Sequence, residues 1–194
     1  MGRNCLTRVS RGALIAFLVA SFAVTAALPR DLFELYSPDV APHARMPDKF
    51  IGNVFGCTGG NVSLPLMWKN APAGTKSFAV TMFDGDEKSG PSGWWHWIVY
   101  DIPPDVNQLV AGAGVEHGAA LPPGASQGRS DLGTAAYQGP CPDPGRPPHH
   151  YLFSVYALKV AKLPIPAESS GAMVTGAALD SLIAKATLVI PYGR

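Results

Sequence analysis

The distribution of proline and glycine is the feature that most limits how this chain can fold. All 19 prolines and 19 of the 21 glycines follow residue 28 in a chain of 194 residues. These two residues therefore break or bend regular structure at about a quarter of the positions after residue 28. Long helices are excluded over most of that stretch.

Short runs rich in β-branched and aromatic residues lie between these breakers and predict strands. They span residues 49–55, 77–83, 94–100, 151–160 and 187–192. In the fourth run apolar residues occupy both faces, which predicts a strand buried between two layers. Apolar residues four positions apart predict one helix, at about 174–186, that packs on the sheet. The chain is expected to be a mainly β domain.

Residues 112–133 lack any periodicity and are rich in glycine, proline and small side chains. This composition predicts a long surface loop. Loops of this length in a compact domain are usually functional or mobile. The segment is therefore a candidate for contact with a protein partner.

The N-terminus carries an export pattern. Arg3, Arg8 and Arg11 precede an uncharged apolar stretch at 12–28, which predicts a signal peptide at 1–27, cleaved near Ala26 or Ala27, and a single domain at 28–194. No stable transmembrane segment would remain, and the product would be periplasmic or secreted. An uncleaved membrane anchor is the alternative, because the uncharged stretch is almost long enough to span a bilayer.

Cleavage would change the charge and the cysteine count. The precursor has 15 basic and 14 acidic residues, and loss of three arginines reverses the net charge from +1 to −2. Neither value provides the basic surface that a nucleic-acid partner requires. Cys5 precedes the apolar stretch, so it is not placed as a lipid-anchored cysteine. Its removal leaves Cys57 and Cys141, an even count suited to an oxidising compartment.

Three clusters at predicted strand ends could carry chemistry. Asp84 and Asp86 follow one strand, His96 lies within Trp-Trp-His-Trp at the next, and residues 139–142 lead to His149-His150-Tyr151 at a third. A hairpin would bring Asp84 and His96 together, so that the carboxylate could orient the imidazole. Histidine and tyrosine donors around such a pocket could accept an anion.

Structural interpretations of the same residues stay open. Asp-Gly-Asp-Glu is a plausible turn, His96 a plausible core residue, and residues 139–148 a plausible rigid loop. We expect no metal site from His96, His149 and His150, because adjacent histidines on a strand point to opposite faces. We expect no catalytic residue and no cofactor: the chain lacks a Gly-x-Ser-x-Gly elbow, and oxidation would consume a Cys141 nucleophile.

In this order the clusters resemble the phosphatidylethanolamine-binding protein (PEBP) family, which includes Raf kinase inhibitor-like proteins and a bacterial YbhB/YbcL-like branch. The resemblance covers about residues 49–194. It is carried by NVSLPLMWKNAPAGTKSFAVTMFD at 61–84, WWHWIVYDIP at 94–103 and YQGPCPDPGRPPHHYLFSVYAL at 137–158.

The resemblance implies a sandwich of two antiparallel sheets with a peripheral helix near the C-terminus. It implies a pocket for a phosphate-like anion or a phospholipid head group and no general catalytic activity. The implied ligand-binding residues are Asp84, Asp86, His96, Gly139, Pro140, His149 and Tyr151. A disulfide between Cys57 and Cys141 is expected, because both cysteines flank matched motifs in loops.

Several positions depart from the family pattern. Gly85 and the pair Glu87-Lys88 replace residues of a proline-containing turn, Asp143 replaces a proline, and His150 replaces an arginine. His150 should point away from the pocket, whereas an inward-facing Glu87 would weaken anion binding.

The leading hypothesis is an exported, non-enzymatic binding protein. Cationic His96 or His149 would raise its affinity for an anion as the pH falls through about 6–7. The first alternative is an interaction module that inhibits a protease, kinase or signalling enzyme, and the second is a hydrolase.

Overall fold

The larger of two sheets is built around a pair of buried strands, β3 (Ser77–Asp84) and β7 (His149–Leu158). All of β3 pairs with β7, and the antiparallel strand order is β6-β4-β3-β7-β8. The remaining strands are β4 (Trp94–Ile102), β6 (Ser126–Gln127) and β8 (Leu182–Tyr192). Phe78, Val80 and Met82 enter one core while Ala79 enters another, because successive side chains of a strand alternate between the two faces.

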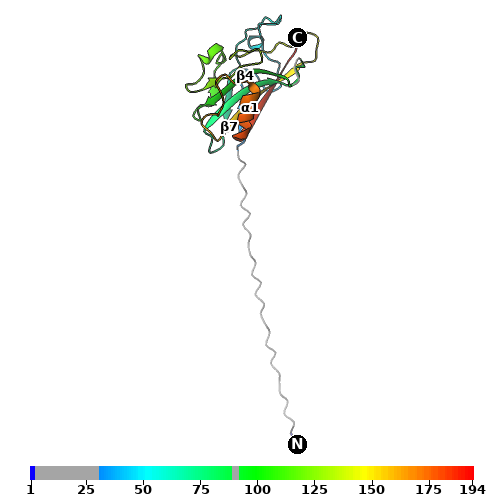
Figure 1. Ribbon diagram of the computed structural model, residues 1–194. Coiled ribbons are helices and arrows are strands. Elements are labelled where there is room, and N and C mark those ends of the chain that lie inside the picture. Colours follow the sequence, from blue (N-terminus) through cyan, green and yellow to red (C-terminus); the bar gives the residue numbers. More distant parts are fainter. Residues whose placement is uncertain (3–30, 89–91) are drawn as a thin grey trace. The chain divides into compact units, whose positions relative to one another are not determined.

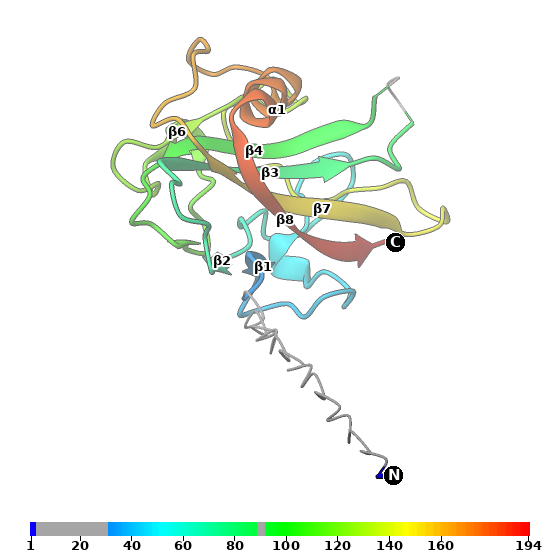
Figure 2. The ribbon, with the colours of Figure 1, turned by 90° about the horizontal axis from the view of Figure 1, so that it is seen from below.

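The smaller sheet closes the first of these cores. It consists of β1 (Glu34–Tyr36), β2 (Leu66–Lys69) and β5 (Gln108–Leu109), in the order β1-β2-β5. Trp68 of β2 packs on Phe78 of β3, with their ring centroids 5.4 Å apart. Figure 2 shows β1 and β2 on one side of the larger sheet and α1 on the other.

The helix α1 (Gly171–Asp180) covers the opposite face of the larger sheet and contacts β4 and β3 (Figure 1). Val174 and Ala178 of α1 are fully buried against Ile98 and Tyr156 of the sheet. Gly171 permits this approach, because a Cβ there would lie 2.3 Å from the Trp95 ring. Ser170 caps the helix by accepting a hydrogen bond from the Met173 amide.

These elements confirm the predicted fold class: the described part of the chain is mainly β, with two antiparallel sheets and one α-helix. Four of the five predicted strands are present. The strand expected at 49–55 was wrong, since the 3-10 helix η1 (Asp48–Phe50) and irregular backbone occupy it. The helix expected at 174–186 was shifted, since α1 ends at Asp180 and β8 begins two residues later.

The structure describes residues 1–2, 31–88 and 92–194, and the predicted signal peptide lies outside these ranges from residue 3 onward. Within them, no helix is long and apolar enough to cross a membrane. The segment 112–133 is largely irregular, as expected, but it contains η2 (Glu116–Gly118) and β6.

Candidate functional site

Strand pairing brings the predicted polar residues to one edge of the larger sheet. Asp84, the last residue of β3, lies opposite Tyr151 of β7 and opposite Trp94 of β4. His149 precedes Tyr151 by two positions on β7, so both side chains fall on the same face. The rings of His96 and Tyr151 meet edge to face, with centroids 5.2 Å apart.

Asp84 is the centre of a hydrogen-bond network. Its side chain is 2% exposed. One carboxylate oxygen, Oδ1, accepts the backbone N–H groups of Asp86 at 2.8 Å and Glu87 at 3.1 Å. The other, Oδ2, lies 2.7 Å from His149 Nδ1. The pKa of Tyr151 is raised by burial and by Asp84, its hydrogen-bond partner. Asp84 therefore fixes both the turn after β3 and two aromatic side chains.

His96 is held as a neutral imidazole. Its Nδ1 lies 2.9 Å from the carbonyl oxygen of Gln138. A carbonyl oxygen only accepts, so Nδ1 carries the proton and Nε2 keeps a lone pair. Burial lowers the pKa of His96 to about 4. His96 consequently acts as an acceptor at pH 6–7, which corrects the sequence-based expectation of a cationic donor at this position.

The depressed pKa of His96 predicts a loss of stability in mild acid. The unfolded chain takes up a proton near pH 6.5, whereas the folded chain does so near pH 4. This difference in pKa stabilises the folded state by roughly 3 kcal/mol above pH 6.5, and the stabilisation is lost as the pH falls toward 4. Urea unfolding of the native protein and of His96→Asn at several pH values measures it. A variant that loses as much stability as the native protein over this range would contradict the assignment.

The loop after Tyr137 supplies structure behind the pocket. Gln138 contributes its carbonyl to His96 and accepts the Trp94 indole N–H at 3.0 Å. Gly139 donates to Asn61, and a Cβ at Gly139 would lie 2.5 Å from the backbone of Gly52. The carbonyl of Pro140 accepts the N–H of Gly52. Gly139 and Pro140 thus dock this loop on residues 51–61 through the backbone.

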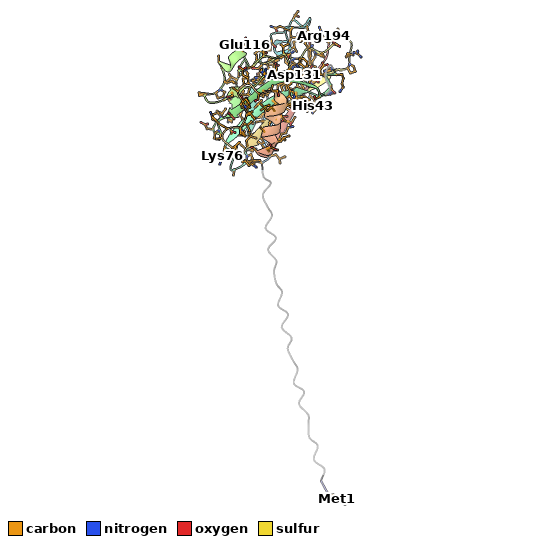
Figure 3. The ribbon with its side chains drawn as sticks, viewed as in Figure 1. Met1, His43, Lys76, Glu116, Asp131 and Arg194 are labelled. Carbon is orange, nitrogen blue, oxygen red and sulfur yellow. A yellow bond between two sulfur atoms is a disulfide. The ribbon has the colours of Figure 1, made fainter. Side chains whose placement is uncertain are left out.

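Two further links join the loops at the pocket rim. Cys57 and Cys141 are paired, with their sulfur atoms 2.09 Å apart. The C-terminal residue, Arg194 (Figure 3), donates to the carbonyls of Phe55, Gly56 and Pro142. Both links connect the loop around residue 55 with the loop around residue 142.

The network opens onto two adjoining cavities. The inner pocket has a volume of about 400 Å³ and is lined by Phe55, Asp84, Glu87, Trp94, His96, Gln138, Cys141, Pro142, Asp143 and Tyr151. The outer cleft has a volume of about 610 Å³ and is lined by Asp86, Glu87, Lys88, Asp143, Arg146, Pro147, Pro148, His149 and His150. Glu87 and Asp143 line both cavities, so the two adjoin at these residues.

The charges of these cavities differ. Three carboxylates and no lysine or arginine occur among the described residues that line the inner pocket. The outer cleft carries Lys88 and Arg146. Its Asp86 lies 2.9 Å from His150, and the hydrogen bonds from His150 lower the pKa of Asp86. The inner pocket therefore offers acceptors, and the outer cleft also offers donors.

The predicted site residues divide among three places. Asp84, His96 and Tyr151 line the inner pocket, Asp86 and His149 line the outer cleft, and Gly139 and Pro140 line neither cavity. Sequence reasoning missed Phe55 and Gln138, which reach the pocket from loops and belong to no cluster of chemical residues. The partner-binding loop expected at 112–133 contributes to neither lining.

Possible metal ligands also meet here. Among the described residues, Asp84, Glu87 and His149 each offer a ligand atom, and these three atoms lie within 4.8 Å of one another. The set differs from the three histidines considered in the sequence, because it takes only one of two adjacent histidines.

Comparison with known proteins identifies the family of this chain. A family model described as phosphatidylethanolamine-binding protein matches residues 36–193. The chain belongs to this family. PEBP proteins are generally binding proteins rather than enzymes, and they bind anions or lipid head groups.

Bacterial PEBP-family proteins are similar over most of the domain. The YbcL protein of Escherichia coli is 45% identical over 161 residues, which cover 83% of this chain and 87% of YbcL. Its crystal structure has a TM-score of 0.80 at 43% identity and covers 84% of this chain and 98% of its own. E. coli YbhB is 40% identical over 73% of this chain and 87% of its own. The PEBP homologue CT736 of Chlamydia trachomatis has a TM-score of 0.70 at 28% identity and covers 84% of this chain and 97% of its own.

Proposed function

We propose that this chain is an exported, non-enzymatic protein that binds a zwitterionic phosphate ester of the phosphoethanolamine type. The ammonium group would enter the inner pocket and the phosphate would lie in the outer cleft. Either a phospholipid head group or the free phosphoester could present this chemistry.

The observation that carries the proposal is the surplus of acceptors in the inner pocket. Asp84, Glu87 and Asp143 contribute carboxylates, and His96 contributes a neutral ring with a lone pair on Nε2. Like charges weaken the binding of an anion in such a site, whereas a primary ammonium brings a positive charge and three hydrogen-bond donors. The inward position of Glu87, foreseen in the sequence as a cause of weaker anion binding, adds to this preference.

The outer cleft supports the second half of the ligand. Arg146 and Lys88 are exposed side chains on its lining, and a guanidinium matches the paired oxygens of a phosphate. Glu87 and Asp143 line both cavities, so the acceptors and these cations lie in adjoining cavities, which the two charged ends of one ligand would occupy. The sequence hypothesis of a phosphate-like anion or a phospholipid head group is therefore narrowed to a head group with charges of both signs.

Export is proposed from the N-terminal pattern of three arginines followed by an uncharged apolar stretch. The pairing of Cys57 with Cys141 supports it, because disulfides persist in oxidising compartments. Partner binding by residues 112–133 would be a separate property, since that segment lines neither cavity.

Calorimetric titration with four small probes tests the ligand class. Phosphoethanolamine should bind about tenfold or more tightly than inorganic phosphate or ethanolamine, which each carry one half of the recognised charge. Phosphocholine should also bind more weakly, because its ammonium has no N–H to donate to His96 or the carboxylates. Arg146→Gln should weaken phosphoethanolamine binding and leave ethanolamine binding unchanged, with Arg45→Gln as the surface control. Inorganic phosphate binding as tightly as phosphoethanolamine would refute the zwitterion.

A further inference from the structure

A mixed cluster of imidazole and carboxylate groups lies where the inner pocket meets the outer cleft. Asp84 comes from the end of β3, Glu87 from the turn that follows, and His149 from the first position of β7. One ligand atom from each lies within 4.8 Å of the other two. Two of these side chains are already in contact, since Asp84 Oδ2 lies 2.7 Å from His149 Nδ1. An ion among the three would draw their ligand atoms to about 2.0–2.2 Å from itself, with Glu87 and His149 adjusting around the buried Asp84.

The two innermost ligands are held in place before any ion arrives. Asp84 Oδ1 is occupied by the backbone N–H groups of Asp86 and Glu87, so Oδ2 faces His149. His149 is only 13% exposed in its side chain and is fixed by strand pairing. A cation bound to His149 Nδ1 would take the place of the proton that this nitrogen shares with Asp84 Oδ2, and the neutral ring would then carry its proton on Nε2.

The position of His96 independently indicates that the inner pocket binds a cation. It is 5% exposed, lies on a different strand and lines the same inner pocket, with Nε2 as a lone-pair acceptor. Asp143 adds a further carboxylate from the loop that follows Gln138. No lysine or arginine among the described lining residues offsets these groups. Acceptors gathered from four separate segments thus converge on one cavity.

We propose that Asp84, Glu87 and His149 bind one divalent transition-metal ion. Zn²⁺ is the best match, because two carboxylates and one imidazole suit a borderline ion better than Mg²⁺ or Ca²⁺, which prefer oxygen ligands. Three protein ligands leave a coordination position open toward the cavity. Asp84 and Glu87 also line the pocket proposed for the ammonium group, but their binding of an ion does not require a phosphoester.

Residues next to the proposed ligands in the sequence, but outside the cluster, provide matched controls. His149 belongs to the cluster, whereas His150 is 58% exposed in its side chain and pairs with Asp86 outside it. Glu87 belongs to the cluster, whereas Asp86 lies one position earlier in the same turn. The test therefore compares His149→Gln with His150→Gln, and Glu87→Gln with Asp86→Asn.

Zn²⁺ titration by calorimetry, with metal content of the gel-filtered protein measured by mass spectrometry, tests the proposal in the absence of phosphoester. We expect one Zn²⁺ per chain, no detectable Mg²⁺ binding, and a loss of Zn²⁺ affinity of about 100-fold in His149→Gln and at least about tenfold in Glu87→Gln. His150→Gln and Asp86→Asn should retain native affinity. Glu87→Gln keeps the test valid if His149→Gln fails to fold. Absence of stoichiometric Zn²⁺, or equal losses within each matched pair, would overturn the site, and neither outcome depends on phosphoethanolamine binding.

Discussion

Replacing Cys57 and Cys141 together by serine should lower the free energy of unfolding by about 4 to 5 kcal/mol in the chain-entropy model. The cysteines are 84 positions apart in the sequence. A bond between them restricts a large loop of the unfolded chain and so raises the free energy of the unfolded state. Denaturant unfolding of the oxidised protein and of the double variant measures the difference.

A reductant provides the control for this prediction. The reduced native protein should unfold at the denaturant concentration of the serine variant, and the variant itself should not respond to reductant. Two free thiols in protein recovered after export, measured by intact mass, would show that the bond does not form.

The same substitution should weaken ligand binding. Cys141 lines the inner pocket, and Cys57 anchors the loop that carries Phe55. Arg194 still joins these loops through three hydrogen bonds to backbone carbonyls. We therefore expect the cysteine variant to bind phosphoethanolamine less tightly but not to lose binding, and Arg194→Ala in the same background to weaken it further.

Asp84→Ala should cause the second large effect, a loss of roughly 3 kcal/mol in the free energy of unfolding together with loss of phosphoethanolamine binding. The substitution removes the acceptor for two backbone N–H groups and for His149, all at a side chain that is 2% exposed. It also removes the deepest carboxylate of the inner pocket. Denaturant unfolding and calorimetry measure the two effects.

Asp86→Ala is the matched control, because Asp86 makes an exposed pair with His150. Exposed pairs contribute about 1 kcal/mol or less. Asp84→Asn keeps the size of the side chain and separates loss of charge from loss of packing. Equal destabilisation by Asp84→Ala and Asp86→Ala would contradict the central role assigned to Asp84.

The strands that could be predicted from sequence are those whose own composition determines them. β3 and β7 are largely apolar on both faces because both faces are buried. The end of α1 was misplaced because Ala178, Leu182 and Ala186 are four positions apart. Residues four positions apart lie on one face of a helix and also on one face of a strand. Long-range pairing of β8 with β7 decides between these two readings.

The candidate site could be predicted only in part for a similar reason. Asp84, His96 and Tyr151 lie on paired strands, so their positions follow from the sheet. Phe55 and Gln138 enter from loops that are positioned by distant contacts, which sequence spacing does not reveal. The tautomer of His96 likewise depends on the Gln138 carbonyl, 42 positions away. This tautomer makes His96 a hydrogen-bond acceptor in the pocket, whereas a cationic ring would donate to an anion.

An NMR titration with phosphoethanolamine tests the central claim most directly, because it locates the two halves of the ligand. We expect shifts at the Trp94 indole N–H, at the backbone amides of Asp86 and Glu87, which donate to Asp84 of the inner pocket, and at the Arg146 side chain in the outer cleft. Ethanolamine should reproduce only the first group of shifts. Shifts confined to Arg146 and Lys88, or the full pattern produced by inorganic phosphate alone, would contradict the assignment of the ammonium group to the inner pocket.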